Sequence, residues 1–328
     1  SKERFDWLKT IAGQIIATPG CESNVKEIFD KTWELRRTRE DAIIFNQFEE
    51  MGNVLWHYQV TGHAIAEAYE SIKTPTSRFA GACFTSGSAG TMSAGDYLKE
   101  QYPYSKLAVG EALQCPTLLE NGFGGHRIEG IGDKHVPWVH NVRNTDMVID
   151  IDDEDSQNLL RLFNSEEGHK YLREVAGVPE ATIEQLSLLG ISGIANVLCC
   201  IKFAKYYELT GDDVVATVAT DSAVMYESRV KELNEQQGNY SLLTAARDFS
   251  EHLHGIRTDN MAELTYADRK RVHNLKYYTW VEQQGKTVEE LNAQWYDHDY
   301  WTGIHEQAKD LDKLITEFNA RTGVAEKI

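Results

Sequence analysis

The chain has 328 residues, 41% of them hydrophobic, and a formal net charge of −18. This length is sufficient for one large domain or two medium domains with real cores, and the scarcity of proline and low-complexity sequence argues against disorder. The acidic charge argues against nucleic acid or an anionic membrane as the main partner, although a local basic pocket for one phosphate is compatible with it.

Short apolar runs alternate with segments of helical periodicity along the first two thirds of the chain. In chain order we predict a strand at 13–20, a helix at 23–37, a strand at 42–48, a helix at 53–72, a strand at 78–88, a helix at 94–103, strands at 106–112 and 146–152, helices at 156–163 and 190–211, and a strand at 213–222. After residue 228 the pattern becomes helical and charged. Such alternation indicates an α/β fold with a parallel sheet and helices on both faces.

Ligands of open parallel sheets bind at the carboxyl ends of the strands. Three predicted strands end in informative residues, namely Gln47, the loop Gly87 to Thr91, and Ser222. These positions are the first candidates for a site.

The loop consists of Gly87, Ser88, Ala89, Gly90 and Thr91, and it lies between a predicted strand and a predicted helix. Small side chains let the backbone approach a ligand, and the N–H groups and dipole at a helix start favour an anion. The loop has neither the Walker ending nor the GxGxxG spacing, so a single phosphate monoester is the expected ligand. An ordinary tight turn before a helix is the alternative.

The segment GSAGTMSAGDYLKEQYP resembles the phosphate-binding segment of cysteine synthase and cystathionine β-synthase, which are pyridoxal-phosphate enzymes of fold type II. Other segments resemble the same family in the same order: SKERFDWLKTIAGQIIATPG, FNQFEEMGNVLWHYQVTGHAI, HRIEGIGDKHVP, LGISGIANV and VATVATDSAVMY. The resemblance extends from Ser1 to about Tyr226.

The resemblance implies two open parallel-sheet domains with helices on both faces, followed by a helical C-terminal extension. Residues 1–72 would be the remainder of a smaller N-terminal domain, 73–228 the large cofactor-binding domain, and 229–328 the helical region. It also implies pyridoxal 5'-phosphate as cofactor, β-elimination or β-replacement on cysteine, serine or an O-activated serine, a small amino-acid substrate, and a homodimer.

By resemblance, the backbone of residues 87–91 would hold the cofactor phosphate and the Ser222 hydroxyl would face the pyridine nitrogen. A neutral hydroxyl leaves the ring a weaker electron sink than a carboxylate would, which suits chemistry at the β-carbon. The neighbouring Asp221 would reverse these electronics if it met the nitrogen, but we interpret it as capping a turn. Gln47 matches a family residue that helps to hold the substrate carboxylate; the alternative is a satisfied amide at a strand end.

Gly130 and Gly132 match a family loop whose backbone borders the cofactor and the substrate. The chain departs from the family pattern directly after this loop, at Asp133, Lys134 and His135. Asp133 is therefore a candidate general base for water or a second nucleophile. Equally, it could point to solvent or pair with Lys134.

The family's Schiff-base lysine and its carboxylate-gripping early loop have no counterpart in the sequence, because Ser1 already matches a position beyond both. Lys9, Lys26 and Lys31 lie at helix ends and faces and are not candidates. We expect the lysine-bearing segment to be cleaved, disordered, left out or on a separate complementing chain. The alternative is a non-catalytic phosphate-binding or interaction scaffold of the same fold.

The remaining polar clusters do not predict a metal site. His252, His254, His298 and His305 lack the helical spacing of zinc ligands, and the acidic run before residue 156 lacks the glycine and final glutamate of a calcium loop. The five cysteines, at 21, 83, 115, 199 and 200, have no regular spacing, and the N-terminus has no signal-peptide core. We therefore expect reduced thiols and a cytoplasmic protein without a membrane segment.

Overall fold

The computed structural model describes residues 1–326, and within them a five-stranded sheet forms the centre of the molecule. The strands lie in the order β4-β1-β2-β3-β5. Their bounds are β1 Arg78–Thr85, β2 Lys106–Ala112, β3 Met147–Ile151, β4 Asp213–Ala216 and β5 Met261–Glu263. The first four are parallel, whereas β5 runs antiparallel to β3. The predicted α/β class with a mainly parallel sheet is confirmed.

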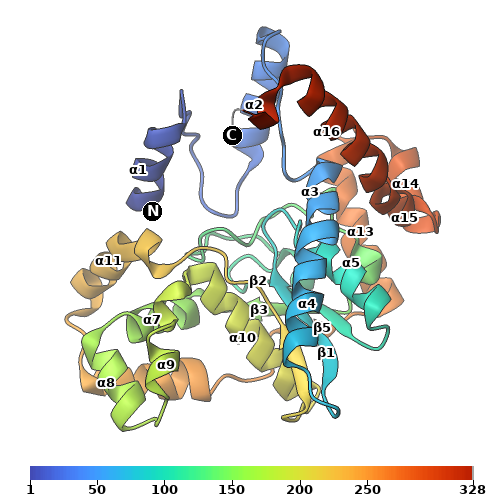
Figure 1. Ribbon diagram of the computed structural model, residues 1–328. Helices are drawn as coiled ribbons and strands as arrows, with labels where there is room; N and C mark the ends of the chain where they lie inside the picture. Colours follow the sequence, from blue (N-terminus) through green and yellow to red (C-terminus); the bar gives the residue numbers. More distant parts are fainter. Residues whose placement is uncertain (327–328) are drawn as a thin grey trace.

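Helices cover both faces of this sheet (Figure 1). Successive residues of the strands point to opposite faces. Ala108 packs with α7 (Asp153–Phe163) and α10 (Ile191–Tyr206), while its neighbours Leu107 and Val109 pack with α4 (His63–Ile72) and α5 (Met92–Gln101). Burial on both faces explains why these strands read as continuous apolar runs in the sequence.

The helices before the sheet and between its strands have the following bounds. They are α1 Lys2–Ile11, α2 Lys26–Thr38, α3 Met51–Trp56, the π-helical turn η1 His57–Gly62, α4 His63–Ile72, α5 Met92–Gln101, α6 Thr117–Glu120, η2 Val142–Asn144, α7 Asp153–Phe163, α8 Glu166–Glu174, α9 Glu180–Ile183, η3 Leu186–Leu188 and α10 Ile191–Tyr206. The predicted helix at 53–72 thus corresponds to α3, η1 and α4.

The C-terminal part of the chain is mostly helical. Its elements are η4 Ala223–Tyr226, α11 Glu227–Gln237, α12 Leu242–Asp248, η5 Phe249–His254, α13 Tyr266–Lys276, η6 Tyr277–Val281, α14 Val288–Tyr296, α15 Tyr300–Glu306, α16 Ala308–Thr322 and η7 Val324–Glu326. Figure 1 shows α13 to α16 on the same side of the molecule as α3 and α5. The region is not wholly helical as predicted, because it also contributes β5 to the sheet.

The two strands predicted at 13–20 and 42–48 are wrong. Among the described residues no strand precedes Arg78, and both segments are irregular. Their apolar side chains stay in contact with solvent: Ile43 is 81% exposed and Phe45 is 85% exposed. A strand requires a hydrogen-bonding neighbour, and the described chain offers none to these segments.

The strand predicted at 213–222 is also shorter than expected, because β4 ends at Ala216. The chain then follows an irregular path in which the Thr217 hydroxyl donates to the Cys83 carbonyl oxygen and the Asn196 amide to the Val218 carbonyl oxygen. These hydrogen bonds take the place of strand-to-strand hydrogen bonds, and they hold the chain as it crosses the end of β1.

Within residues 1–326, none of the helices combines the length and the apolar character that crossing a bilayer requires.

Candidate cofactor site

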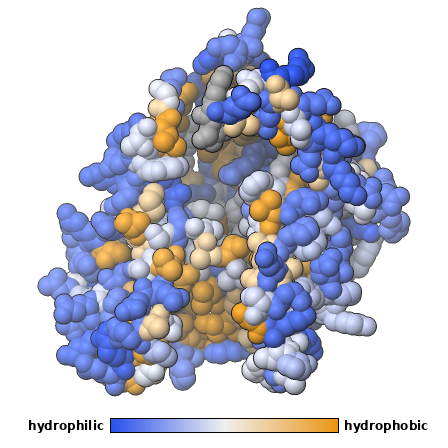
Figure 2. Space-filling view, in the orientation of Figure 1, coloured by the Kyte–Doolittle hydropathy of each residue, from blue (hydrophilic) through white to orange (hydrophobic). Residues whose placement is uncertain are grey.

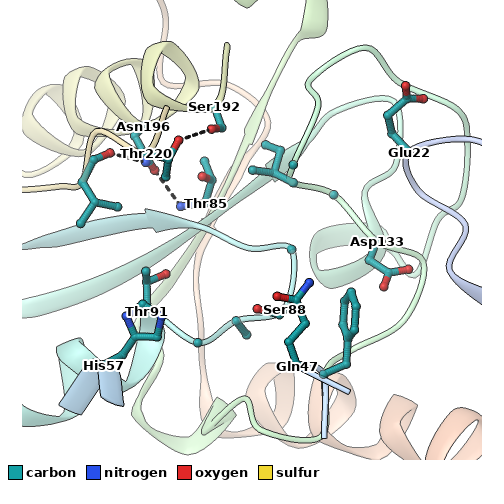
Figure 3. Close-up of a pocket in the computed structure, with 18 of the residues that line it drawn as sticks. Glu22, Gln47, His57, Thr85, Ser88, Thr91, Asp133, Ser192, Asn196 and Thr220 are labelled. Carbon is teal, nitrogen blue, oxygen red and sulfur yellow. Dashed lines mark hydrogen bonds between the residues drawn. The ribbon is translucent and has the colours of Figure 1, made fainter. Parts of the chain in front are cut away.

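A cavity of about 400 Å³ lies at the carboxyl end of β1. Figure 2 shows a hollow on this face of the molecule, and Figure 3 shows the side chains that line the cavity. Its walls come from the loop after β1, the loop at 130–133, the start of α10, the segment after β4 and the chain around Gln47. The sheet therefore places its cavity where a parallel sheet normally binds ligands.

The loop of residues 87–91 forms one wall of the cavity. The backbone N–H groups of these five residues find no acceptor within the described part of the chain, whereas that of Ser86 before them donates to the Gly110 carbonyl oxygen at 2.8 Å. Ala89 has a φ of 62°, which reverses the chain direction before α5 begins at Met92. A row of unpaired N–H groups at a helix start is a suitable cradle for a phosphate.

Glycine is needed at two positions of this loop because other segments approach it closely. A Cβ on Gly87 would lie 2.7 Å from the carbonyl oxygen of Gly130. A Cβ on Gly90 would overlap the Asn53 amide and lie 2.7 Å from His57 Cδ2. The small residues thus permit a tight cup between α3 and the loop at 130–133, which fits a phosphate group.

Hydroxyl and amide groups line the opposite side of the cavity (Figure 3). Thr220 Oγ1 lies 2.7 Å from Ser192 Oγ at the start of α10. Asn196, one turn further along α10, accepts the Thr85 N–H at 2.8 Å and donates to the Val218 carbonyl oxygen at 2.8 Å. These groups could contact a polar ring atom of a ligand whose phosphate occupies the cup.

Ser222, the predicted partner of the pyridine nitrogen, is not among the residues that line the cavity. Since β4 ends early, the irregular chain after it brings Thr220 to the cavity wall and carries Ser222 past it, to the start of η4. At this wall Thr220, two residues earlier in the chain, supplies a neutral hydroxyl beside that of Ser192.

Asp221 is turned away from the cavity. Its Oδ2 accepts hydrogen bonds from Arg4 at 2.5 Å and from the Tyr226 hydroxyl at 2.6 Å. These contacts connect Asp221 to α1 and η4, and the interpretation that it caps a turn stays a prediction.

Gln47 lines the cavity at its rim, and Figure 3 shows its side chain beside Ser88. The backbone carbonyl oxygen of Gln47 accepts a hydrogen bond from Asn53 Nδ2 at 2.9 Å, and the same Nδ2 lies 3.3 Å from Ser88 Oγ. Asn53 thus ties the Gln47 segment to the phosphate cup.

We call residues 130–140 the Asp133 loop. Gly130 and Gly132 have φ values of 94° and 71°, in the region that favours glycine, and the Gly132 N–H donates to the Ser86 carbonyl oxygen at 2.8 Å. Both glycines line the cavity, and so does Asp133.

Asp133 is 9% exposed, and it lines the cavity. Within residues 1–326 it does not point into bulk solvent and it forms no ion pair. Oδ1 accepts the His135 N–H at 3.2 Å, and Oδ2 finds no hydrogen-bond partner within residues 1–326. Burial raises the pKa of Asp133 to about 7. A carboxylate with one unpaired oxygen and a pKa near neutrality has the properties of a general base.

No Lys or Arg of the described chain lines the cavity. Lys9, Lys26 and Lys31 form ion pairs with Asp6, Asp30 and Glu34 on exposed helix faces. His57 does line the cavity, and burial lowers its pKa, which leaves the ring neutral at pH 7. A phosphate here would be held by N–H and hydroxyl donors.

Among residues 1–326, no group of three or more His, Cys, Asp or Glu side chains is arranged to hold a metal ion. His252 lies 2.7 Å from Asp155 and His305 stacks on Tyr58. Both therefore have structural partners.

Several lining residues were not among the predicted site residues, and they include His57, Ser192, Asn196 and Thr220. One of them left a signal, since Asn196 is a polar residue inside the long apolar run that forms α10. The other three have no local pattern that separates them from ordinary helix or loop residues.

Comparisons with known proteins identify similar sequences and similar folds. No protein-family model matches the chain. A probable cysteine synthase from Bacillus subtilis is 29% identical over 229 residues, which are 70% of this chain and 66% of that protein. The chain therefore spans slightly less than two thirds of the length of this relative.

Solved structures show the same fold. An O-acetylserine-dependent cystathionine β-synthase from Helicobacter pylori is 24% identical, with a TM-score of 0.55 over 70% of this chain and 66% of that one. A hydrogen sulfide-producing enzyme from Fusobacterium nucleatum is 23% identical, with a TM-score of 0.56 over 76% of this chain and 67% of that one. The chain is thus similar in sequence to a probable cysteine synthase and shares the α/β fold of these two solved enzymes.

Proposed function

We propose that the chain is the cofactor-holding part of a pyridoxal-phosphate enzyme that catalyses β-elimination or β-replacement on cysteine, serine or an O-activated serine. The observation that carries the proposal is the cup of five N–H groups at residues 87–91, which faces a cavity bordered by a hydroxyl pair and a buried carboxylate. When bound, the cofactor withdraws electrons from the Cα of an amino acid, so that the α-proton and the β-substituent can leave.

Each group of the chain then has a defined task. The N–H groups of residues 87–91 bind the phosphate, and Thr220 presents a neutral hydroxyl on the far wall. Gln47 at the rim orients the substrate carboxylate. Asp133 takes a proton from water or from a second nucleophile through Oδ2, which has no other partner within the described residues.

The Schiff-base lysine would come from a segment outside this sequence. Two features of the surface support such a segment. Within residues 1–326, β4 is an edge strand that pairs only with β1. Beside it, α10 presents a half-buried apolar stripe made of Val197, Cys200, Ile201 and Ala204. Figure 2 shows apolar residues gathered on this face below the hollow. An unpaired edge beside apolar surface is normally covered by another segment.

The same proposal includes a homodimer and a cytoplasmic setting. The exposed aromatic side chains of the C-terminal region, among them Tyr278 and Tyr296, are suited to a subunit contact, and the five cysteines carry free thiols, as reducing conditions would keep them.

Binding of pyridoxal phosphate is the first test. We expect the chain to bind it saturably in a calorimetric titration and inorganic phosphate to compete. Borohydride reduction should leave no cofactor attached at the cavity of this chain, whereas a polypeptide that includes the upstream segment should gain one cofactor mass. Failure to bind either pyridoxal phosphate or phosphate would contradict the proposal. Binding without attachment in the longer polypeptide would favour the non-catalytic scaffold.

The role of Asp133 is tested with Asp133→Asn in the longer polypeptide. Because burial raises the pKa of Asp133 to about 7, the proton-accepting form increases as the pH rises through 7, and the rate should increase with it. We expect the variant to lose about 10²- to 10⁴-fold in rate and to lose this pH dependence.

Glu22→Gln is the matched control, since Glu22 is the other carboxylate that lines the cavity. It should keep both the rate and the pH profile. Equal losses in the two variants would show that a general change in cavity charge, and not proton transfer by Asp133, is responsible.

A further inference from the structure

The C-terminal region contains a lysine that is completely buried. Lys276 at the end of α13 has an exposed fraction of 0%, and its Nζ donates to the carbonyl oxygens of Trp138 at 2.9 Å and His140 at 2.7 Å and to Gln294 Oε1 at 2.7 Å. Three donors thus meet three acceptors. A buried lysine is costly to the fold, so this arrangement indicates that holding the two carbonyl groups matters.

Two further residues of the same region hold the part of the loop next to Asp133. Trp280 Nε1 donates to the Val136 carbonyl oxygen at 2.8 Å, and Thr279 Oγ1 lies 2.8 Å from His135 Nδ1. Burial lowers the pKa of His135 to about 4, so its ring is neutral at pH 7 and one ring nitrogen is available to this contact. We call Lys276, Thr279, Trp280 and Gln294 the C-terminal clamp.

The neighbouring chain around Gln47 is also connected to this region. Lys286 lies 3.2 Å from the Glu49 carboxylate, and its Nζ lies 5.7 Å from the centre of the Trp138 ring. The Val139 N–H contacts the Phe48 carbonyl oxygen at 3.4 Å. Both segments that carry the candidate substrate contacts, Gln47 and Asp133, are therefore supported by the same C-terminal elements.

We propose that the C-terminal clamp is a positioning element that fixes the Asp133 loop, so that the Asp133 carboxylate stays buried and directed into the cavity. The proposal rests on the proposed function only for the chemical role of Asp133. Residues 276–294 would thus be part of the active-site support, although none of the four clamp residues lines the cavity.

The test uses the full 328-residue chain and the mild variant Thr279→Val. Hydrogen–deuterium exchange should become about tenfold faster at residues 133–136, which corresponds to about 1.4 kcal/mol. The Lys134 N–H, which donates to the Ser23 carbonyl oxygen at 3.1 Å, is the reporter. The midpoint of Asp133 in a carbon-detected NMR titration should fall by at least one pH unit, because solvent reaches the carboxylate. Thr279→Ser should restore both values.

Lys276→Met is the stronger variant and should accelerate exchange at residues 138–142 about a hundredfold. Tyr240→Phe is the matched control, since it removes a partly buried hydrogen bond of 2.8 Å to Asp248 at the end of α12, away from the loop. It should leave the loop and the Asp133 midpoint unchanged.

The proposal would be overturned by an unchanged Asp133 midpoint in Thr279→Val, or by exchange that increases equally over the whole chain. Its failure is distinguishable from failure of the proposed function. Pyridoxal phosphate should bind Thr279→Val within about twofold of the unmodified chain, because the phosphate cup does not touch the clamp. Loss of cofactor binding in the unmodified chain would instead refute the proposed function and leave the exchange result intact.

Discussion

Replacing Gly87 with alanine is expected to weaken binding of pyridoxal phosphate by a hundredfold or more, equivalent to about 2.7 kcal/mol. The added Cβ would lie 2.7 Å from the carbonyl oxygen of Gly130, a backbone atom that cannot rotate away. Relief of this overlap must separate the loop of residues 87–91 from the loop that carries Gly130. These loops form two walls of the same cavity, so the N–H groups of the cup would no longer converge on one phosphate.

Calorimetric titration with pyridoxal phosphate and with inorganic phosphate measures this effect. Both ligands should weaken together, because the predicted damage is to the phosphate cup. Gly52→Ala is the control, since a Cβ at that position of α3 meets no atom within 4 Å. If Gly87→Ala binds both ligands like the unmodified chain, the phosphate cup has been assigned to the wrong loop.

The sequence predicts the centre of this fold well because burial on two faces leaves a clear pattern. The strands β1, β2 and β3 and the helix α10 all lie within the ranges predicted from apolar runs. The glycine positions of the loop at 87–91 are equally visible, since only small residues let the Gly130 backbone approach at Gly87 and the Asn53 and His57 side chains approach at Gly90. Features that depend on local packing density can be predicted from local sequence.

The failures have a different cause, namely that strands and loop paths depend on partners elsewhere in the chain. Residues 13–20 and 42–48 have suitable composition for strands but no neighbouring strand within the described chain. The position of Thr220 at the cavity wall, with Ser222 beyond it, follows from where β4 stops and from the hydrogen bonds of Thr217 and Asn196 after it. Neither effect has a local signature.

The C-terminal clamp could not be predicted from the sequence for a related reason. Lysine is normally read as a surface residue, and α13 has a charged sequence that predicts a solvent-facing helix. Lys276 is nevertheless fully buried, because the carbonyl groups of Trp138 and His140 lie where its ammonium group can reach them. Those acceptors are more than 130 residues away in sequence.

The chain is also expected to lose stability as the pH rises, because it contains a buried pair of acidic residues. Glu111 on β2 and Asp150 on β3 are register partners, and they are 2% and 1% exposed. Burial, followed by the charge of Asp150, raises the pKa of Glu111, and burial raises the pKa of Asp150 to about 7. The pair therefore retains protons in the folded chain at pH values where unfolded carboxyl groups have lost them.

The sign of the effect follows from proton linkage. A group whose pKa is higher in the folded chain than in the unfolded chain stabilises the fold when it is protonated. Its contribution is fully present below about pH 4 and is lost as the pH rises through 7. Unfolding by urea at pH 6, 7 and 8 should thus show a falling free energy of unfolding. Glu111→Gln should flatten this dependence and stabilise the chain at pH 8 by about 1–2 kcal/mol. An amide can still accept from the Leu118 and Leu119 N–H groups, which Glu111 binds at 2.9–3.0 Å, and it cannot ionise.

Glu235→Gln provides the comparison, because its carboxylate side chain is 67% exposed on α11 and should leave the pH dependence unchanged. A Glu111→Gln chain that retains the unmodified slope would show that other buried acids control it. Asp96 and Asp133 are the remaining candidates, since burial raises the pKa of each to about 7. Of the three sites, only the Glu111–Asp150 pair places two carboxyl groups side by side within the sheet. We therefore expect this pair to cause the larger share of the loss of stability at alkaline pH.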